Sequence, residues 1–273
     1  MQDTSFISPV SEVPALWSDL LAQFEVKPQV SIIIPALNEA KIIENLLQSF
    51  TPEIRQRLGL ELILSDGGST DDTISLAKPF VDKVVLHERP ERQTIAAGRN
   101  AGAAASKGDV LLFFNADVRL PQHLESFLRD LIEAVEQNGA ATCNVEVHPD
   151  EARWSDRLVL GACNVYFHFL NVIGVGMGRG ECHAVSRTIF EALGGYRAEL
   201  AAGEDFDLYN RIARHTRQHR SGKIRFLSNW AIYEDPRRYR AIGYARTMLK
   251  WFENAASIFV RGRALDDEWT PFR

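Results

Sequence analysis

The 273-residue sequence has few cysteines, no excess of positive charge and no secretory signal pattern at its start. Its three cysteines, Cys143, Cys163 and Cys182, are odd in number and are spaced neither as a disulfide framework nor as a zinc site, which predicts a reducing compartment. A formal net charge of −5 argues against nucleic acid as a partner. The first residues lack a basic stretch followed by an apolar core. We therefore predict a cytoplasmic protein.

The sequence also lacks internal repeats, low-complexity tracts and long linkers. Its length and its 45% hydrophobic residues are sufficient for one large domain with a substantial core. We predict that this domain covers residues 28–235. An amphipathic pattern at residues 14–24 predicts a short docking helix within an N-terminal extension, residues 1–27. A basic, amphipathic extension follows over residues 236–273.

Short apolar runs alternate with helical patterns through the first half of the chain. Runs that predict buried strands lie at residues 30–35, 61–64, 84–86, 110–114 and 141–147. Amphipathic or alanine-rich patterns between them predict helices at residues 42–47, 94–105 and 121–136. This alternation is typical of βαβ units, so we predict an α/β fold with a mostly parallel central sheet and flanking helices.

Polar clusters follow three of these strands: Asn38-Glu39, Asp66 and Asn115 to Asp117. The carboxyl ends of parallel strands meet at one edge of a sheet, where ligands bind in open α/β folds, so the clusters are expected to converge. A carboxylate such as Asp117 at that edge suits a divalent metal that holds a diphosphate. Each cluster by itself is more typical of a cap or turn, and Asp66-Gly67-Gly68 alone favours turn chemistry.

The segment from residue 158 to 178 is poor in charge and about long enough to span a bilayer. However, Arg157, Asn164, His168 and Asn171 share one helical stripe, and glycines at 174, 176, 178 and 180 interrupt the pattern. We therefore expect an amphipathic helix followed by a glycine-rich loop, where the backbone approaches a ligand. A strand is expected at residues 181–186.

Five motifs together resemble family 2 glycosyltransferases. They are residues 35–39 (PALNE), 66–71 (DGGSTD), 98–102 (GRNAG), 115–117 (NAD) and 203–205 (GED), in the family's order and at plausible spacing. The resemblance implies a GT-A fold, a nucleotide-sugar donor of the UDP or GDP type, Mn²⁺ or Mg²⁺, and inversion at the anomeric carbon. The implied acceptor is a carbohydrate or a lipid-linked hydroxyl.

The resemblance also implies roles for individual residues. The donor-binding set would be Pro35, Ala36, Asn38, Glu39, Asp66, Gly68, Arg99, Asn115, Ala116 and Asp117. Within it, Asp66 would accept hydrogen bonds from the base, Arg99 would lie near the donor, and Asp117 would bind the metal. Asp205 matches the general base that takes the proton of the acceptor hydroxyl. The acceptor or diphosphate side would comprise Gly180, Glu204, Arg237 and Arg238.

The sequence departs from the family pattern at two positions. Gly67 replaces the second acid of the first turn, and Asn115 replaces the first acid of the metal triplet, which removes one charge from the site. Two other functions remain open. A nucleotidyltransferase would need a glycine-rich, basic signature after the first strand, and residues 35–41 (PALNEAK) do not supply one. The other alternative is a non-catalytic nucleotide-sugar-binding module that docks on membranes.

The C-terminal segment from Pro236 to Arg263 holds seven Lys or Arg residues and a single acid, Glu253. Its apolar helical face comprises Tyr244, Met248, Trp251, Phe252, Ala255 and Phe259. Such a helix could rest peripherally on the anionic inner face of a membrane and receive a lipid-linked acceptor. Packing on the domain, or against a second subunit in a homodimer, are the alternatives.

Overall fold

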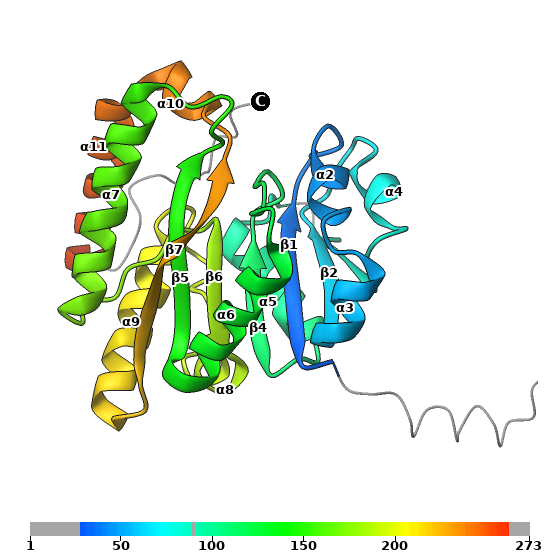
Figure 1. The fold of residues 1–273 in the computed structure, drawn as a ribbon, viewed down its shortest axis with the longest axis horizontal. Coiled ribbons are helices and arrows are strands. Elements are labelled where there is room, and N and C mark those ends of the chain that lie inside the picture. Colours follow the sequence, from blue (N-terminus) through cyan, green and yellow to red (C-terminus); the bar gives the residue numbers. More distant parts are fainter. Residues whose placement is uncertain (1–27, 89–90, 262–273) are drawn as a thin grey trace, which may run out of the picture.

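The computed structural model, described over residues 28–88 and 91–261, contains a central sheet with the strand order β3-β2-β1-β4-β6-β5-β7 (Figure 1). The strands are β1 (Val30–Ala36), β2 (Leu60–Asp66), β3 (Lys83–Leu86), β4 (Val110–Phe114), β5 (Gly139–Val147), β6 (Cys182–Ser186) and β7 (Lys223–Glu234). Only β6 runs antiparallel to its neighbours, β4 and β5, among these strands. The predicted α/β fold with a mostly parallel sheet is confirmed.

Helices cover both faces of this sheet. They are α2 (Ile43–Leu47), α3 (Pro52–Leu58), α4 (Thr73–Ala77), α5 (Ile95–Ala105), α6 (Leu124–Asn138), α7 (Trp154–Val172), α8 (Arg187–Ala192), α9 (Glu204–His219), α10 (Arg237–Ile242) and α11 (Tyr244–Arg261). Side chains from α2, α3, α4 and α6 pack in one core cluster, and those from α5, α8 and α9 pack in another. The helix predicted at residues 14–24 lies outside the described residues.

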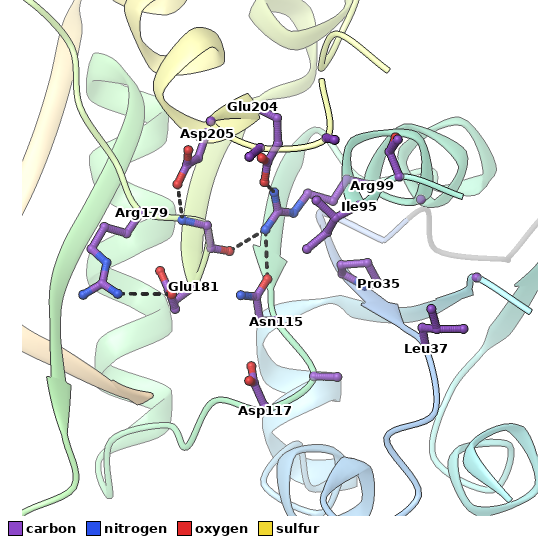
Figure 2. Close-up of a pocket in the computed structure, with 18 of the residues that line it drawn as sticks. Pro35, Leu37, Ile95, Arg99, Asn115, Asp117, Arg179, Glu181, Glu204 and Asp205 are labelled. Carbon is purple, nitrogen blue, oxygen red and sulfur yellow. Dashed lines mark hydrogen bonds and ion pairs between the residues drawn. The ribbon is translucent and has the colours of Figure 1, made fainter. Parts of the chain in front are cut away.

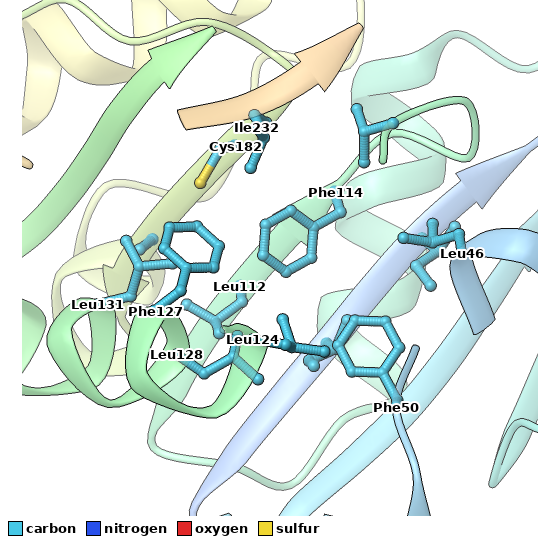
Figure 3. Close-up of a cluster of buried hydrophobic side chains, with 14 of the residues drawn as sticks. Leu46, Phe50, Leu112, Phe114, Leu124, Phe127, Leu128, Leu131, Cys182 and Ile232 are labelled. Carbon is cyan, nitrogen blue, oxygen red and sulfur yellow. The ribbon is translucent and has the colours of Figure 1, made fainter. Parts of the chain in front are cut away.

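Strand β4 joins the two core clusters because all five of its residues are buried. Successive side chains of a strand point to opposite faces, so Leu112 and Phe114 contribute to the α6 side while Phe113 contributes to the α9 side. Phe114 lies 6.5 Å from the ring of Phe127 on α6, and Phe113 lies 5.4 Å from the ring of Phe190 on α8 (Figure 3 shows the α6 side). The continuous apolar run therefore reflects burial on both faces, as predicted.

Strand β7 is the one strand of the described sheet for which the sequence analysis made no prediction. It pairs in parallel with β5, but the pairing shifts from Cys143–Leu227 to Asn144–Ala231 at a bulge. The extra residues 228–230 break the alternation of buried and exposed side chains along the strand. This irregularity removed the period-two pattern by which a strand is recognised in a sequence.

Helix α7 confirms the prediction of an amphipathic helix with a polar stripe, followed by a glycine-rich loop. Two asparagines on this stripe bind α7 to neighbouring backbone segments by hydrogen bonds. The buried Asn164 amide pairs with both backbone groups of Val145 on β5, at 3.1 and 3.2 Å. The Asn171 amide pairs with both backbone groups of Met177 in the loop, at 2.9 and 2.7 Å. Within the described residues, no helix is long and apolar enough to cross a membrane.

The glycine-rich loop generates a testable contrast between Gly174 and Gly176. Both have positive φ angles, of 78° and 84°. A Cβ on Gly174 would meet nothing within 4 Å, whereas one on Gly176 would clash with the Tyr209 carbonyl and lie 2.7 Å from the Ala213 Cβ. We expect Gly174→Ala to cost about 1 kcal/mol through backbone strain. Gly176→Ala should cost about 2 kcal/mol more, because its neighbours are backbone and helix atoms. Urea unfolding of both variants measures the difference, and equal losses would contradict the close packing of this loop on α9.

Candidate functional site

A pocket of about 520 Å³ lies at the carboxyl edge of β1 and β4 (Figure 2). Segments far apart in the sequence contribute to it: the turns after β1, β2 and β4, helix α5, the loop before β6, the start of α9 and helices α10 and α11. The predicted site residues that line it are Pro35, Ala36, Glu39, Arg99, Asn115, Ala116, Asp117, Gly180, Glu204, Asp205 and Arg237. The fold thus brings most of the predicted residues to one cavity.

Arg99 on α5 connects three other segments at the base of this pocket. Its side chain is fully buried, and its two terminal nitrogens donate to Glu204 Oε1 at 2.7 Å, to Asn115 Oδ1 at 2.8 Å and to the Gly180 carbonyl at 2.8 Å. A buried guanidinium needs such charged and polar partners, because its isolated burial is very unfavourable. These contacts make Arg99 an organiser of the pocket, whereas its contact with a donor stays a prediction.

Asp205 lies in the first turn of α9 and faces the pocket opposite the turn after β1 (Figure 2). Its Oδ2 accepts a hydrogen bond of 3.0 Å from the backbone N–H of Gly180. The backbone carbonyl of Gly180 in turn accepts a hydrogen bond from Arg99. Burial and, to a smaller extent, the negative charge of Glu204 raise the pKa of Asp205 to about 7, against an opposing hydrogen bond from the Phe206 N–H. Near neutral pH, Asp205 can therefore both accept and release a proton.

The turn after β4 places Asp117 on the pocket surface, two residues beyond Asn115. The Asn115 side-chain oxygen is already the acceptor for Arg99, which explains how an uncharged amide serves at this position. Within the described residues, no group of three or more His, Cys, Asp or Glu residues is arranged to hold a metal ion. A hard cation can nevertheless bind through a single carboxylate when phosphate oxygens and water complete its shell. Asp117 therefore fits a metal that arrives with a diphosphate.

The first predicted turn differs from the expectation, because Asp66, Asn38 and Gly68 do not line the pocket. Asp66 is 1% exposed and closes its own turn, accepting hydrogen bonds from the Gly68 and Ser69 backbone N–H groups at 2.9 and 2.8 Å. Asn38 accepts a 2.6 Å bond from the Thr70 N–H, so it braces the two turns together. Asp66 therefore closes its own turn, and Gly67 lies on the pocket surface. The contact of Asp66 with a donor base stays a prediction.

A second buried arginine, Arg179, was missed by the sequence analysis. Its guanidinium donates to Glu234 at 2.7 Å and to Glu181 at 3.2 Å, and lies 5.1 Å from the centre of the Trp251 ring. Burial raises the pKa of Glu234 to about 7, despite the nearby Arg179. Arg179 lies within the glycine-rich run noted in the sequence. Its partner Glu234 lies at the end of β7, a strand that no sequence pattern revealed, so the pair could not be predicted.

The C-terminal helices also contribute to the pocket. Arg237 on α10 and Trp251, Asn254 and Ala255 on α11 line it, while the side chain of Arg238 lies outside the described part of the structure. Helix α11 packs along α7, where the Tyr244 hydroxyl donates to Asp156 at 2.9 Å. Residues after 235 therefore belong to the site as well as to the surface of the domain.

The buried pair of Arg99 and Glu204 can be tested by a double-mutant cycle. Arg99→Met leaves the Glu204 carboxylate buried without a counter-charge, so we expect a loss of about 3–5 kcal/mol in unfolding free energy. Adding Glu204→Gln should recover part of that loss, with a coupling energy above about 1 kcal/mol in urea unfolding at pH 7.5. The exposed pair of Arg129 and Glu125 is the matched control, with an expected coupling below about 0.5 kcal/mol. Simple additivity at Arg99 and Glu204 would contradict their pairing.

Comparison with known proteins identifies relatives of this chain in sequence and in structure. The sequence model described as glycosyl transferase family 2 matches residues 31–194. The succinoglycan biosynthesis protein ExoA of Rhizobium meliloti is 27% identical over 194 residues, which are 67% of this chain and 57% of that protein. A PGL/p-HBAD biosynthesis glycosyltransferase of Mycobacterium tuberculosis is 39% identical over 95 residues, or 33% of this chain. The match spans about a third (36%) of that relative's length.

Two solved structures share the fold. A mannosyltransferase from Pyrobaculum calidifontis, in complex with GDP-Man and Mn²⁺, aligns with a TM-score of 0.61 and 21% identity over 89% of this chain and 71% of that chain. Glucosyl-3-phosphoglycerate synthase from Mycobacterium tuberculosis, in complex with Mn²⁺, UDP-glucose and phosphoglyceric acid, aligns with a TM-score of 0.58 and 18% identity over 95% of this chain and 86% of that chain. The family match covers more than half of the chain, and the fold is GT-A. The chain belongs to glycosyl transferase family 2.

Proposed function

We propose that the chain transfers a sugar from a nucleotide-diphosphate donor to an acceptor hydroxyl, with inversion at the anomeric carbon. The observation that carries this proposal is Asp205, a pocket carboxylate whose pKa is raised to about 7 and which the Gly180 N–H holds in place. A general base works best when its pKa lies near the working pH. Family membership supports transfer of a sugar over the nucleotidyltransferase alternative.

The donor is proposed to bind along the turns after β1 and β4. Pro35, Ala36 and Glu39 line the pocket on one side, and Ala116 and Asp117 line it on the next strand. Ligands of open α/β sheets bind beyond the carboxyl ends of the strands, where these turns lie. The structural neighbours were solved with GDP-Man and with UDP-glucose, which supports a nucleotide sugar of one of these types.

The reaction is a single displacement. Asp205 takes the proton of the acceptor hydroxyl, the oxygen forms a bond to the anomeric carbon, and the bond from that carbon to the diphosphate breaks. The electron pair of the broken bond leaves with the diphosphate. Attack from the face opposite the leaving group inverts the configuration. Arg99 binds the carbonyl of Gly180, and the N–H of the same residue binds Asp205, so Arg99 is a positioning residue that acts through Gly180.

Asp117 is proposed to hold Mn²⁺ or Mg²⁺. A bound divalent cation would act as a Lewis acid and stabilise the negative charge of the departing diphosphate. Both ions occur in complexes of the structural neighbour glucosyl-3-phosphoglycerate synthase. The chain supplies a carboxylate at the pocket surface, and the Asn115 amide, bound to Arg99, adds no charge there.

The acceptor is proposed to bind on the side of Arg179, Glu181 and Arg237, which line the pocket together with Trp251. Arg179 brings a buried positive charge, and one of its terminal nitrogens, Nη1, has no hydrogen-bond partner. A carbohydrate or lipid-linked acceptor remains the proposed class. A cytoplasmic location and a homodimer also remain predictions.

Asp205→Asn is expected to lower kcat by about 10²–10⁴-fold while leaving the donor Kd nearly unchanged, because it removes the base but keeps the shape of the side chain.

The same carboxyl predicts a pH dependence. Below about pH 7 the wild-type carboxyl is protonated and inactive, so kcat/KM should rise with pH and level off above about 7. The variant should lose this rise. Rates between pH 5.5 and 8.5 on a panel of nucleotide sugars provide the measurement. Glu91→Gln, which changes another pocket-lining acid, is the control. Unchanged turnover in Asp205→Asn would reject the assignment.

Asp117→Asn is expected to abolish the gain in donor affinity that Mn²⁺ provides, because the amide is a weaker ligand for a hard cation than a carboxylate. Calorimetric titration of UDP or GDP with and without Mn²⁺ measures this gain directly, without any need for turnover. Asp235→Asn alters another acid of the pocket and should retain the gain. If both variants respond to Mn²⁺ as the wild type does, the metal binds elsewhere.

A further inference from the structure

Exposed apolar side chains are concentrated at one edge of the molecule. In the described part of the chain, ten large apolar side chains are strongly exposed, and nine of them belong to α7, its C-cap or α11. The nine, named here the apolar ridge, are Trp154, Leu158, Val165, Tyr166, Phe169, Val172, Ile173, Leu249 and Phe252. The tenth, Leu86, lies on β3, which is the edge strand of the sheet farthest from β5 and β7. Single exposed apolar residues are ordinary, but such a cluster marks an interaction surface.

The ridge occupies the outer face of both helices. On α7, Leu158, Val165 and Val172 recur every seven residues, on the side opposite the buried Leu160 and Phe167. A shallow hollow lies among the ridge residues of α7, with the small Gly161 and Ala162 between the larger side chains. The two helices lie along the same edge of the molecule in Figure 1, so their exposed side chains can meet one partner.

The charges beside the ridge are almost all positive. The exposed cations on these helices and at the α7 N-cap are Arg153, Arg157, Arg246, Lys250 and Arg261. Glu253 is the single exposed acid on α7 and α11 within their described residues. Aromatic side chains flanked by Lys and Arg are typical of helices that lie in a bilayer interface. A second copy of the chain would instead bring like charges together, which is unfavourable.

The inner faces of the same helices line the candidate catalytic pocket. Phe167 on α7 and Trp251, Asn254 and Ala255 on α11 all contribute to it. A partner on the outer face would therefore lie one helix thickness from the pocket. We propose that the outer faces of α7 and α11 dock on an anionic lipid bilayer, with the apolar ridge in the interface and the flanking cations on the headgroups.

Vesicle flotation of the full chain tests this proposal without donor or acceptor, so its outcome is independent of the transfer reaction. The protein is mixed with phosphatidylcholine vesicles that either contain or lack the anionic lipid phosphatidylglycerol. We expect flotation with the anionic vesicles and its loss at high salt. Val165→Asp with Phe169→Asp should abolish it. Leu86→Asp, the exposed apolar side chain outside the ridge, is the matched control and should float as the wild type does.

Neutralising the cations beside the apolar ridge tests the electrostatic contribution to bilayer binding. Arg157→Gln with Lys250→Gln should lower the partition coefficient about 30-fold, from about 1 kcal/mol for each cation at an anionic surface. Lys78→Gln with Arg225→Gln, exposed cations outside the ridge, should have little effect. Circular dichroism verifies that every variant is folded. Absence of wild-type flotation, or equal flotation of the ridge variants, would overturn the proposal. Dimers that dissociate in the ridge variants, without vesicle binding, would instead show an interface between copies of this chain.

Discussion

The buried ion pair between Arg99 and Glu204 is the interaction on which the candidate site depends. Arg99 lies on α5 and Glu204 begins α9, yet their side chains meet at 2.7 Å, with 0% and 9% of their surfaces exposed. The same guanidinium binds Asn115 after β4 and Gly180 before β6, so one side chain joins four segments that approach the pocket from different directions. Removing such charges from water is costly, and the ion pair and these hydrogen bonds offset that cost, although Arg99 Nε has no hydrogen-bond partner.

Burial has the largest effect on the pKa of Asp205. Desolvation raises this pKa most, the charge of Glu204 raises it less, and Arg99 lowers it only weakly. Glu234 follows the same pattern beside Arg179, with its pKa also raised to about 7. The pocket thus contains two carboxyl groups that titrate near neutral pH, each near a buried arginine.

The fold and much of the site could be predicted because their signals are local. The continuous apolar run of β4 requires burial on both faces, and the polar residues after β1 and β4 follow their strands directly, so the parallel sheet brings them to one edge. Asp66 also lies at the carboxyl end of its strand, but it does not line the pocket. Its carboxylate satisfies the backbone of its own turn, an outcome that the glycines beside it also predicted. Strand β7 was missed because its bulge destroys the alternation that identifies a strand.

The sequence by itself determined the order of the strands as far as β6, the family and the residue types at the carboxyl edge, since these depend on periodicity and on motifs of adjacent residues. Only the tertiary structure decided the partners of Arg99, the role of Arg179 and the place of α11 against the pocket. It also decided that α7 buries Asn164 and Asn171 beside Leu160 and Phe167, and that most of its other large apolar side chains are exposed. Burial and charge compensation arise from contacts between residues as far apart as Arg99 and Glu204, and no local pattern specifies them.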